Sequence, residues 1–82
     1  MTARFEIRLA QHVRARRAAV RLTQADLADL SGVSERFVRS LEHGKPTLRL
    51  ESVLSVLHAL GLDLEVTSRR LHKEPAARSQ DL

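Results

Sequence analysis

The stretch LTQADLADLSGVSERFVRSLEHGK, residues 22–45, decides the fold. Thr23 is a good N-cap residue, and Asp26 stands three positions later, where its carboxylate can reach back to the cap. The helix that starts there ends at Gly32, because glycine accepts the left-handed or tight turn that follows a helix. Ser34 then caps a second helix. The stretch therefore predicts two short helices joined by a turn of about four residues.

The second helix of this unit should bury one side and expose the other. Over about residues 34–43, Val38 and Leu41 form its apolar seam. Both helices of the unit have short seams, so they need further helices to pack against. Apolar residues at spacings of three and four predict one such helix over about residues 4–20 and another over about residues 50–60. The sequence therefore predicts an all-α bundle of about four to five helices.

After Gly61 the hydrophobic period changes to two, with apolar Leu62, Leu64 and Val66 between polar residues. This alternation predicts a short, half-buried β-strand. A single strand has no partner in a helical chain, so its backbone groups favour pairing with the same strand of a second subunit. The alternative is an extended segment that lies on the helices. On the first interpretation, the three apolar residues are dimerisation residues.

The chain is short enough for a single domain, and it contains no cysteine. It therefore has no disulfide framework and no thiolate metal site. The sequence after Ser68 is polar, includes Pro75 and shows no hydrophobic period, which is typical of a flexible tail. We expect one folded domain, with the dimerisation residues at its end, over residues 1–68 and a flexible tail over residues 69–82.

Charge is unevenly distributed along the chain, whose formal net charge is +4. Residues 1–39 hold eight Arg and four acidic residues, whereas residues 40–68 hold two basic and four acidic residues. One end of the domain is therefore suited to a polyanion, and the alternative is ordinary arginine-rich solubility. An aromatic content of 2% counts against modules that stack single-stranded bases on aromatic side chains. No apolar stretch resembles a membrane span or a signal peptide, so we expect a soluble cytoplasmic protein associated with the nucleoid.

No residue pattern supports catalysis. The four His residues lack metal-ligand spacing, no glycine elbow surrounds a serine, and the three glycines form no phosphate-binding loop. We therefore expect no enzymatic activity, no metal and no cofactor.

The outward side of the predicted 34–43 helix carries the side chains best suited to base recognition. In a DNA-bound unit of this geometry, the second helix lies in the major groove with its N-terminal residues at the base edges. Arg can bind guanine through two hydrogen bonds, and Glu can accept one from cytosine. The alternative is the solvated polar face of any amphipathic helix. The candidate readers, with the two arginines ranked first, are Ser34, Glu35, Arg36, Arg39 and Ser40.

Further candidate DNA contacts lie outside this helix. Gln24 stands in the first turn of the preceding helix, where its amide can reach a DNA phosphate beside main-chain N–H groups. The alternative for Gln24 is ordinary helix surface. Thr23 and Lys45 complete the predicted DNA-contacting set.

Two charged residues fall on or beside apolar faces. Arg17 lies on the apolar face of the predicted first helix, and Glu42 adjoins the seam of the 34–43 helix. A charge on a buried face needs a partner, so we expect these two residues to form a structural ion pair that ties the helices together.

The two capped helices of residues 22–45, together with the flanking predicted helices, resemble the Cro/repressor (Xre-like) helix-turn-helix family. The resemblance covers about residues 9–66 and includes Arg17 and the predicted 50–60 helix. It implies that Arg17 pairs with Glu42 and that Gln24 contacts phosphate and sometimes a base. The other matching features are Thr23-Gln24, Leu27-Ala28, Gly32-Val33-Ser34, Leu41-Glu42 and Gly44-Lys45.

Within that family, LEHGKPTLRLESVLSVLHALGLDLEV, residues 41–66, is similar to antitoxins of HipB type. This similarity implies four helices, a C-terminal strand paired across a two-fold dimer, a flexible tail and a HipA-type kinase toxin as partner. The tail lacks the terminal tryptophan of the best-known member. From the similarity to antitoxins of HipB type, we expect a homodimeric repressor of a palindromic double-stranded operator, acting as an antitoxin that autoregulates its operon. The alternatives are a stand-alone repressor without a toxin and a protein-interaction module that does not touch DNA.

Overall fold

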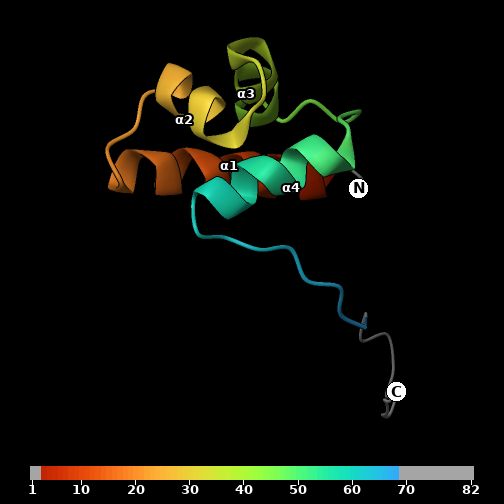
Figure 1. Cartoon of the computed structure of the whole chain (residues 1–82). Coiled ribbons are helices and arrows are strands. Elements are labelled where there is room, and N and C mark those ends of the chain that lie inside the picture. The colour runs from red at the N-terminus through yellow and green to blue at the C-terminus, as the bar shows by residue number, and fades with distance from the viewer. Residues whose placement is uncertain (1–2, 69–82) are drawn as a thin grey trace.

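This computed structural model describes residues 3–68 of the chain. The described part contains four α-helices joined by short loops. In Figure 1, α2 and α3 lie on one side of α1 and α4, and residues 62–68 continue from the C-terminal end of α4. Helix α2 contacts α3 and α4, and α3 also contacts α1. The predicted all-α bundle is confirmed. The helices are α1 (Ala3–Ala19), α2 (Gln24–Ser31), α3 (Glu35–Glu42) and α4 (Leu50–Ala59).

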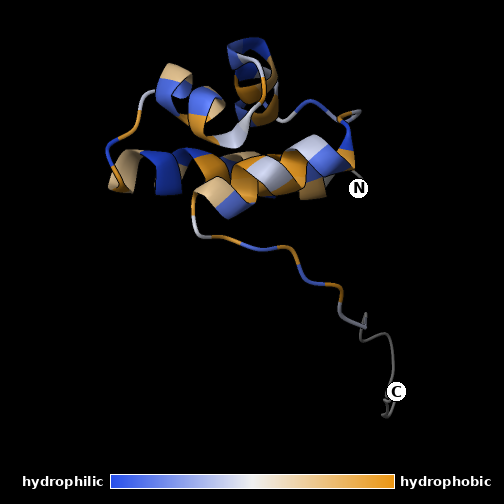
Figure 2. Cartoon of the chain, viewed as in Figure 1, coloured by the Kyte–Doolittle hydropathy of each residue, from blue (hydrophilic) through white to orange (hydrophobic). Residues whose placement is uncertain are grey.

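The core is aliphatic and receives side chains from every helix. Figure 2 shows hydrophobic and hydrophilic residues interleaved along each helix, as expected where each helix buries one stripe. None of the helices in residues 3–68 has the length and apolar character needed to cross a bilayer. The most deeply buried large side chains are Val13, Leu27, Val38, Leu41 and Val56.

Local capping sets the turn between α2 and α3. The Thr23 hydroxyl accepts a hydrogen bond from the Asp26 N–H, and the Asp26 carboxylate accepts one from the Thr23 N–H, both at 3.0 Å. The hydrogen bond from the Thr23 N–H to the carboxylate is the largest cause that lowers the pKa of Asp26. Gly32 ends α2 in the left-handed region with φ 72°, where a side chain would be strained. The Ser34 hydroxyl accepts from the Phe37 N–H at 3.0 Å and starts α3.

Residues 62–68 follow α4 without helix or strand. The β-strand predicted for this segment is not present in the described residues. Leu62 and Leu64 are half-buried and pack against the core, whereas Val66 is 95% exposed, so within one chain the segment matches the alternative of an extended stretch that lies on the helices. A single copy of the chain offers this segment no second strand, so pairing with another subunit stays a prediction. The tail predicted over residues 69–82 lies outside the described residues.

Candidate nucleic-acid interface

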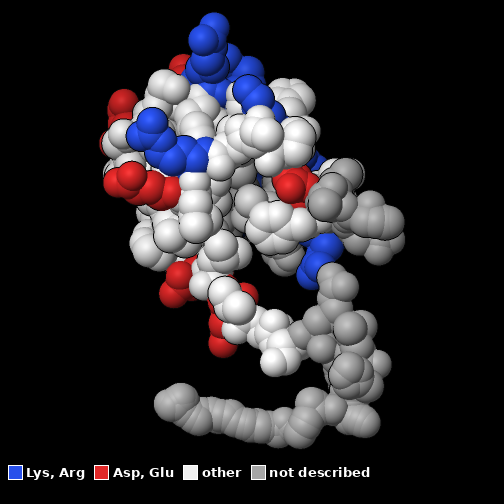
Figure 3. Space-filling view, turned by 90° about the vertical axis from the view of Figure 1, so that its right-hand side faces the viewer, with Lys and Arg blue, Asp and Glu red and all other residues white. Residues whose placement is uncertain are grey.

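The outward face of α3 presents basic side chains at one end of the molecule. Ser34, Glu35, Arg36 and Arg39 are exposed, as the helical spacing predicts. Figure 3 shows Lys and Arg side chains projecting from the top of the molecule, the end that α3 occupies in Figure 1. Ser40 differs from the expectation because it is half-buried. It stands next to buried Leu41, on the border between the two faces of α3.

Two of the candidate readers are engaged with each other. Glu35 Oε2 and Arg39 Nη2 lie 3.2 Å apart, one helical turn apart in sequence, and both side chains are about half exposed. Such an exposed pair is weak, so Arg39 can leave it at little cost. Among the described residues, Arg36 takes part in no ion pair. Arg36 is therefore the more available of the two arginines.

The inner side of α3 is fixed by a buried carboxylate. Arg17 Nε lies 2.6 Å from Glu42 Oε2, and Arg17 Nη2 lies 2.9 Å from Glu42 Oε1, so the guanidinium binds both oxygens. The Glu42 side chain is 2% exposed and the Arg17 side chain 21%. Arg17 also donates to the Leu22 carbonyl at 2.9 Å. The two residues that the sequence led us to pair thus join α1 to the end of α3 and to the loop before α2.

The charges around Glu42 keep it ionised despite its burial. Burial raises the pKa of Glu42, but hydrogen bonds from Arg17 and Gln24, with the charges of Arg17 and Arg14, lower it below its ordinary value. The same hydrogen bond to Glu42 raises the pKa of Arg17, against the opposing effect of burial. The ion pair therefore stays charged through the neutral range.

Gln24 has a role that the sequence did not reveal. Its Nε2 donates to Glu42 Oε1 at 3.1 Å, and the residue is half-buried rather than displayed on an open helix surface. Because a carboxylate only accepts hydrogen bonds, this contact fixes which end of the amide faces Glu42. Gln24 thereby links the start of α2 to α3. Its predicted phosphate contact can use only what this bond leaves free, the amide oxygen and the second N–H.

Two arginines of α1 also hold the ends of other helices. Arg14 donates from Nη1 to the backbone carbonyl of Glu42, and Arg16 donates from Nε to the Leu60 carbonyl at 2.8 Å. The last carbonyls of a helix lack intrahelical partners and carry partial negative charge, so they attract guanidinium groups. From the sequence alone, both arginines count only as general positive charge. Much of the basic surplus of α1 therefore serves the fold.

The remaining candidate contacts flank α3 and α2. Thr23 is exposed, but its hydroxyl caps α2. Lys45 is exposed in the loop after Gly44, which has φ 76° and approaches α1 at Ile7. These two residues stand at the two ends of the stretch of chain that carries α2 and α3.

The residues described here contain no group of three or more metal-ligating side chains. His43 Nδ1 lies 2.7 Å from the Arg39 carbonyl, and His58 Nε2 lies 3.2 Å from Asp63 Oδ1. Both histidines are exposed and make these local contacts within or next to their own helices.

The similarity to known proteins covers the same helices. The profile of a family described as helix-turn-helix matches residues 13–66. A curated relative, the uncharacterized HTH-type transcriptional regulator y4mF of Sinorhizobium fredii (strain NBRC 101917 / NGR234), is 43% identical over 54 residues. The matched region spans 66% of this chain and 71% of that relative. The chain therefore belongs to the helix-turn-helix family.

Proposed function

We propose that this protein is a sequence-specific transcriptional repressor that places α3 in the major groove of double-stranded DNA. The observation that carries the proposal is the division of α3 into two sides. Its inner side is held to α1 and α2 through Glu42, while Arg36 and Arg39 project from its outer side. A helix so fixed presents its side chains at a set angle, which base recognition requires.

Arg36 and Arg39 are the first candidates for reading guanine, because each can donate two hydrogen bonds to its O6 and N7 atoms. Glu35 can accept from a cytosine amino group once Arg39 has turned to the DNA. Ser34 and Ser40 can contact either a base or a phosphate. The remaining proposed contacts position the protein on the DNA backbone: Thr23, Gln24 and Lys45.

Footprinting on the DNA upstream of the protein's own gene, at stated salt, tests this function. Each of Arg36→Ala and Arg39→Ala should weaken binding by about 1–3 kcal/mol if that arginine reads a guanine, and should relax sequence preference at its own position. Arg49→Ala, which removes an exposed arginine before α4, is the matched control. Unchanged operator affinity in the double variant would support the protein-interaction module instead.

We also propose that the repressor acts as a homodimer on a palindromic operator, with Leu62, Leu64 and Val66 at the subunit contact. Half-sites about one helical turn apart, or a multiple of that distance, match a two-fold dimer. Leu64→Pro removes a backbone donor from the segment and should give monomers with weakened operator binding. A variant that remains fully dimeric by light scattering contradicts strand pairing.

The finer role that we propose is that of an antitoxin, with a HipA-type kinase toxin as partner and the shared operon as target. The support is the similarity of residues 41–66 to antitoxins of HipB type. The adjacent open reading frame is the first test, and co-purification of its product with this chain is the second. A neighbouring gene without a kinase sequence favours the stand-alone repressor.

A further inference from the structure

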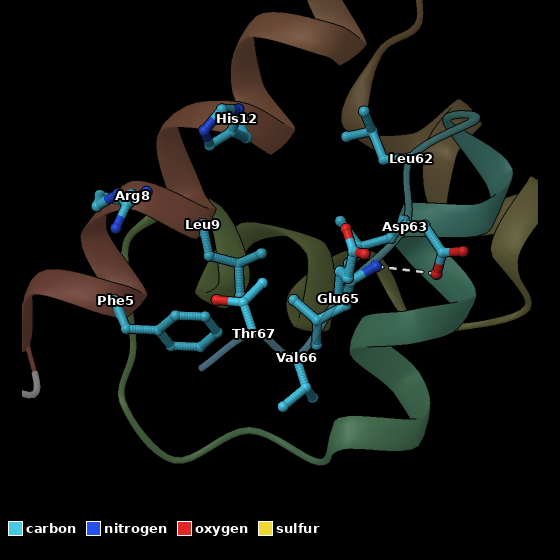
Figure 4. A pocket seen from close by; sticks show the side chains of 11 residues that line it. Phe5, Arg8, Leu9, His12, Leu62, Asp63, Glu65, Val66 and Thr67 are labelled. Carbon is cyan, nitrogen blue, oxygen red and sulfur yellow. Dashed lines mark hydrogen bonds between the residues drawn. The ribbon is translucent and has the colours of Figure 1, made fainter. Parts of the chain in front are cut away.

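A groove of about 760 Å³ lies between α1 and the segment that follows α4 (Figure 4). The α1 wall carries Phe5, Arg8, Leu9 and His12, and residues 62–67 form the facing wall. Figure 4 shows the Phe5 and Leu9 side chains of α1 turned toward the end of this segment. Six of the eleven lining residues are apolar, and two of these, Phe5 and Val66, are 51% and 95% exposed. Covering this exposed apolar surface with an occupant would be favourable.

The two walls of the groove carry opposite charges. Arg8 and His12 are four residues apart and share one face of α1, whereas Asp63 and Glu65 are two residues apart on the extended segment. Within residues 3–68, neither Arg8 nor Glu65 takes part in an ion pair. A purely anionic ligand would meet the acidic wall, and a purely cationic one would meet the basic wall. An occupant with both signs in the same arrangement suits the groove better.

The backbone of the segment is open as well. Its last backbone hydrogen bond to the bundle is from the Leu62 N–H to the Leu57 carbonyl at 2.8 Å. The Leu64 N–H donates to the Asp63 side chain at 2.8 Å. In the part of the chain that the structure describes, no other main-chain group of residues 63–68 is hydrogen-bonded. An extended occupant could therefore add a strand along this edge.

We propose that each groove receives residues 62–67 of a second copy of this chain, and that Arg8 pairs with the partner's Glu65. In a two-fold interface, the basic wall of each copy meets the acidic segment of the other. Two antiparallel segments then lie between the two α1 helices, with their backbones paired and Val66 covered. This inference rests on the proposed homodimer and assigns it an α1 surface and a charge pairing.

Reversing the charges of Arg8 and Glu65 tests their pairing, and the measurement needs no DNA. Arg8→Glu and Glu65→Arg should each raise the dimer dissociation constant about tenfold or more, because each variant turns two attractive contacts into two repulsive ones. The double variant should return the constant to within about threefold of the parent, as a restored pair does. Asp29→Arg makes the same charge change as Glu65→Arg on exposed α2 and should leave the constant unchanged. Sedimentation equilibrium gives the constants, and circular dichroism verifies that each variant is folded.

Three results would overturn the inference. Single variants that dimerise like the parent place the groove outside the interface. Single variants that weaken the dimer without rescue in the double variant contradict the pairing of these two residues. A parent chain that stays monomeric well above micromolar concentration removes the homodimer as well. The Arg36 and Arg39 footprint would still report on DNA recognition, so failure here and failure of the repressor function are distinguishable.

Discussion

The inner side of α3 and the segment after α4 each carry a glutamate, and the two glutamates have opposite environments. Glu42 is 3% exposed as a residue and accepts hydrogen bonds from Arg17 and Gln24. Glu65 is exposed and, within residues 3–68, joins no ion pair. The chain thus completes by itself the contacts that orient α3, and it leaves open the contacts of the segment proposed to join two copies. The orientation of α3 and the proposed dimerisation should therefore be separable.

The largest expected effect comes from breaking the inner cluster. Glu42→Ala removes the acceptor of Arg17 and Gln24 and leaves a guanidinium without its partner. We expect a loss of about 3 kcal/mol in the free energy of unfolding, at the lower end for a buried pair because the Arg17 side chain is 21% exposed. Urea denaturation measures the loss, with Asp29→Ala on exposed α2 as the control. A loss under about 1 kcal/mol would show that water already screens the pair.

Acid should weaken the same cluster. The pKa of Glu42 in the folded chain lies below its ordinary value of 4.5, so its contribution to stability is fully present above that pH. The contribution is lost as pH falls through the folded-state pKa, because the unfolded chain binds the proton more readily. The difference in unfolding free energy between the parent and Glu42→Gln should therefore shrink below about pH 4.5. A difference that does not vary with pH would contradict the charged pair.

A smaller effect is expected at the cap that positions Gln24. Thr23→Ala removes the hydroxyl that accepts from the Asp26 N–H at the start of α2. Loss of such a cap costs about 1 kcal/mol of unfolding free energy. Thr23→Ser keeps the acceptor and should lose much less, so thermal or urea unfolding of the two variants isolates the hydrogen bond. Equal losses in both variants would assign the effect to the methyl group.

Local chemistry made most of the fold predictable. The bounds of the helices follow from N-cap residues, glycines and spacing, which are read within a few residues of one another. The pair of Arg17 and Glu42 was also predictable, since each charge breaks an apolar face and each needs a partner. The sequence therefore indicated both the helical frame and the contact that fixes α3.

What the sequence could not supply depends on the angles between helices. The hydrogen bond from Gln24 to Glu42 requires the start of α2 to meet the end of α3. The contacts of Arg14 and Arg16 require α1 to pass the carbonyl ends of α3 and α4. Neither contact between helices is encoded by residues close in sequence. Hydrophobic periodicity therefore assigns these side chains to a face of their helix but does not identify their partners. The half-burial of Ser40 also depends on packing, because a residue on the border between the two faces of α3 is covered or exposed according to how α3 sits on its neighbours.

The smallest expected effect on stability concerns residues 62–68, the segment after α4. Val66 is 95% exposed, so Val66→Asp should change the unfolding free energy of the monomer by less than about 0.5 kcal/mol. Leu57→Ala, at a side chain 2% exposed in the core, should lose about 2–5 kcal/mol in the same urea titration. The same Val66→Asp variant should nevertheless shift the dimer toward monomers in sedimentation, because the proposed subunit contact would bury its carboxylate. A large loss of monomer stability would mean that the segment belongs to the bundle, and an unchanged dimer would mean that Val66 lies outside the subunit contact.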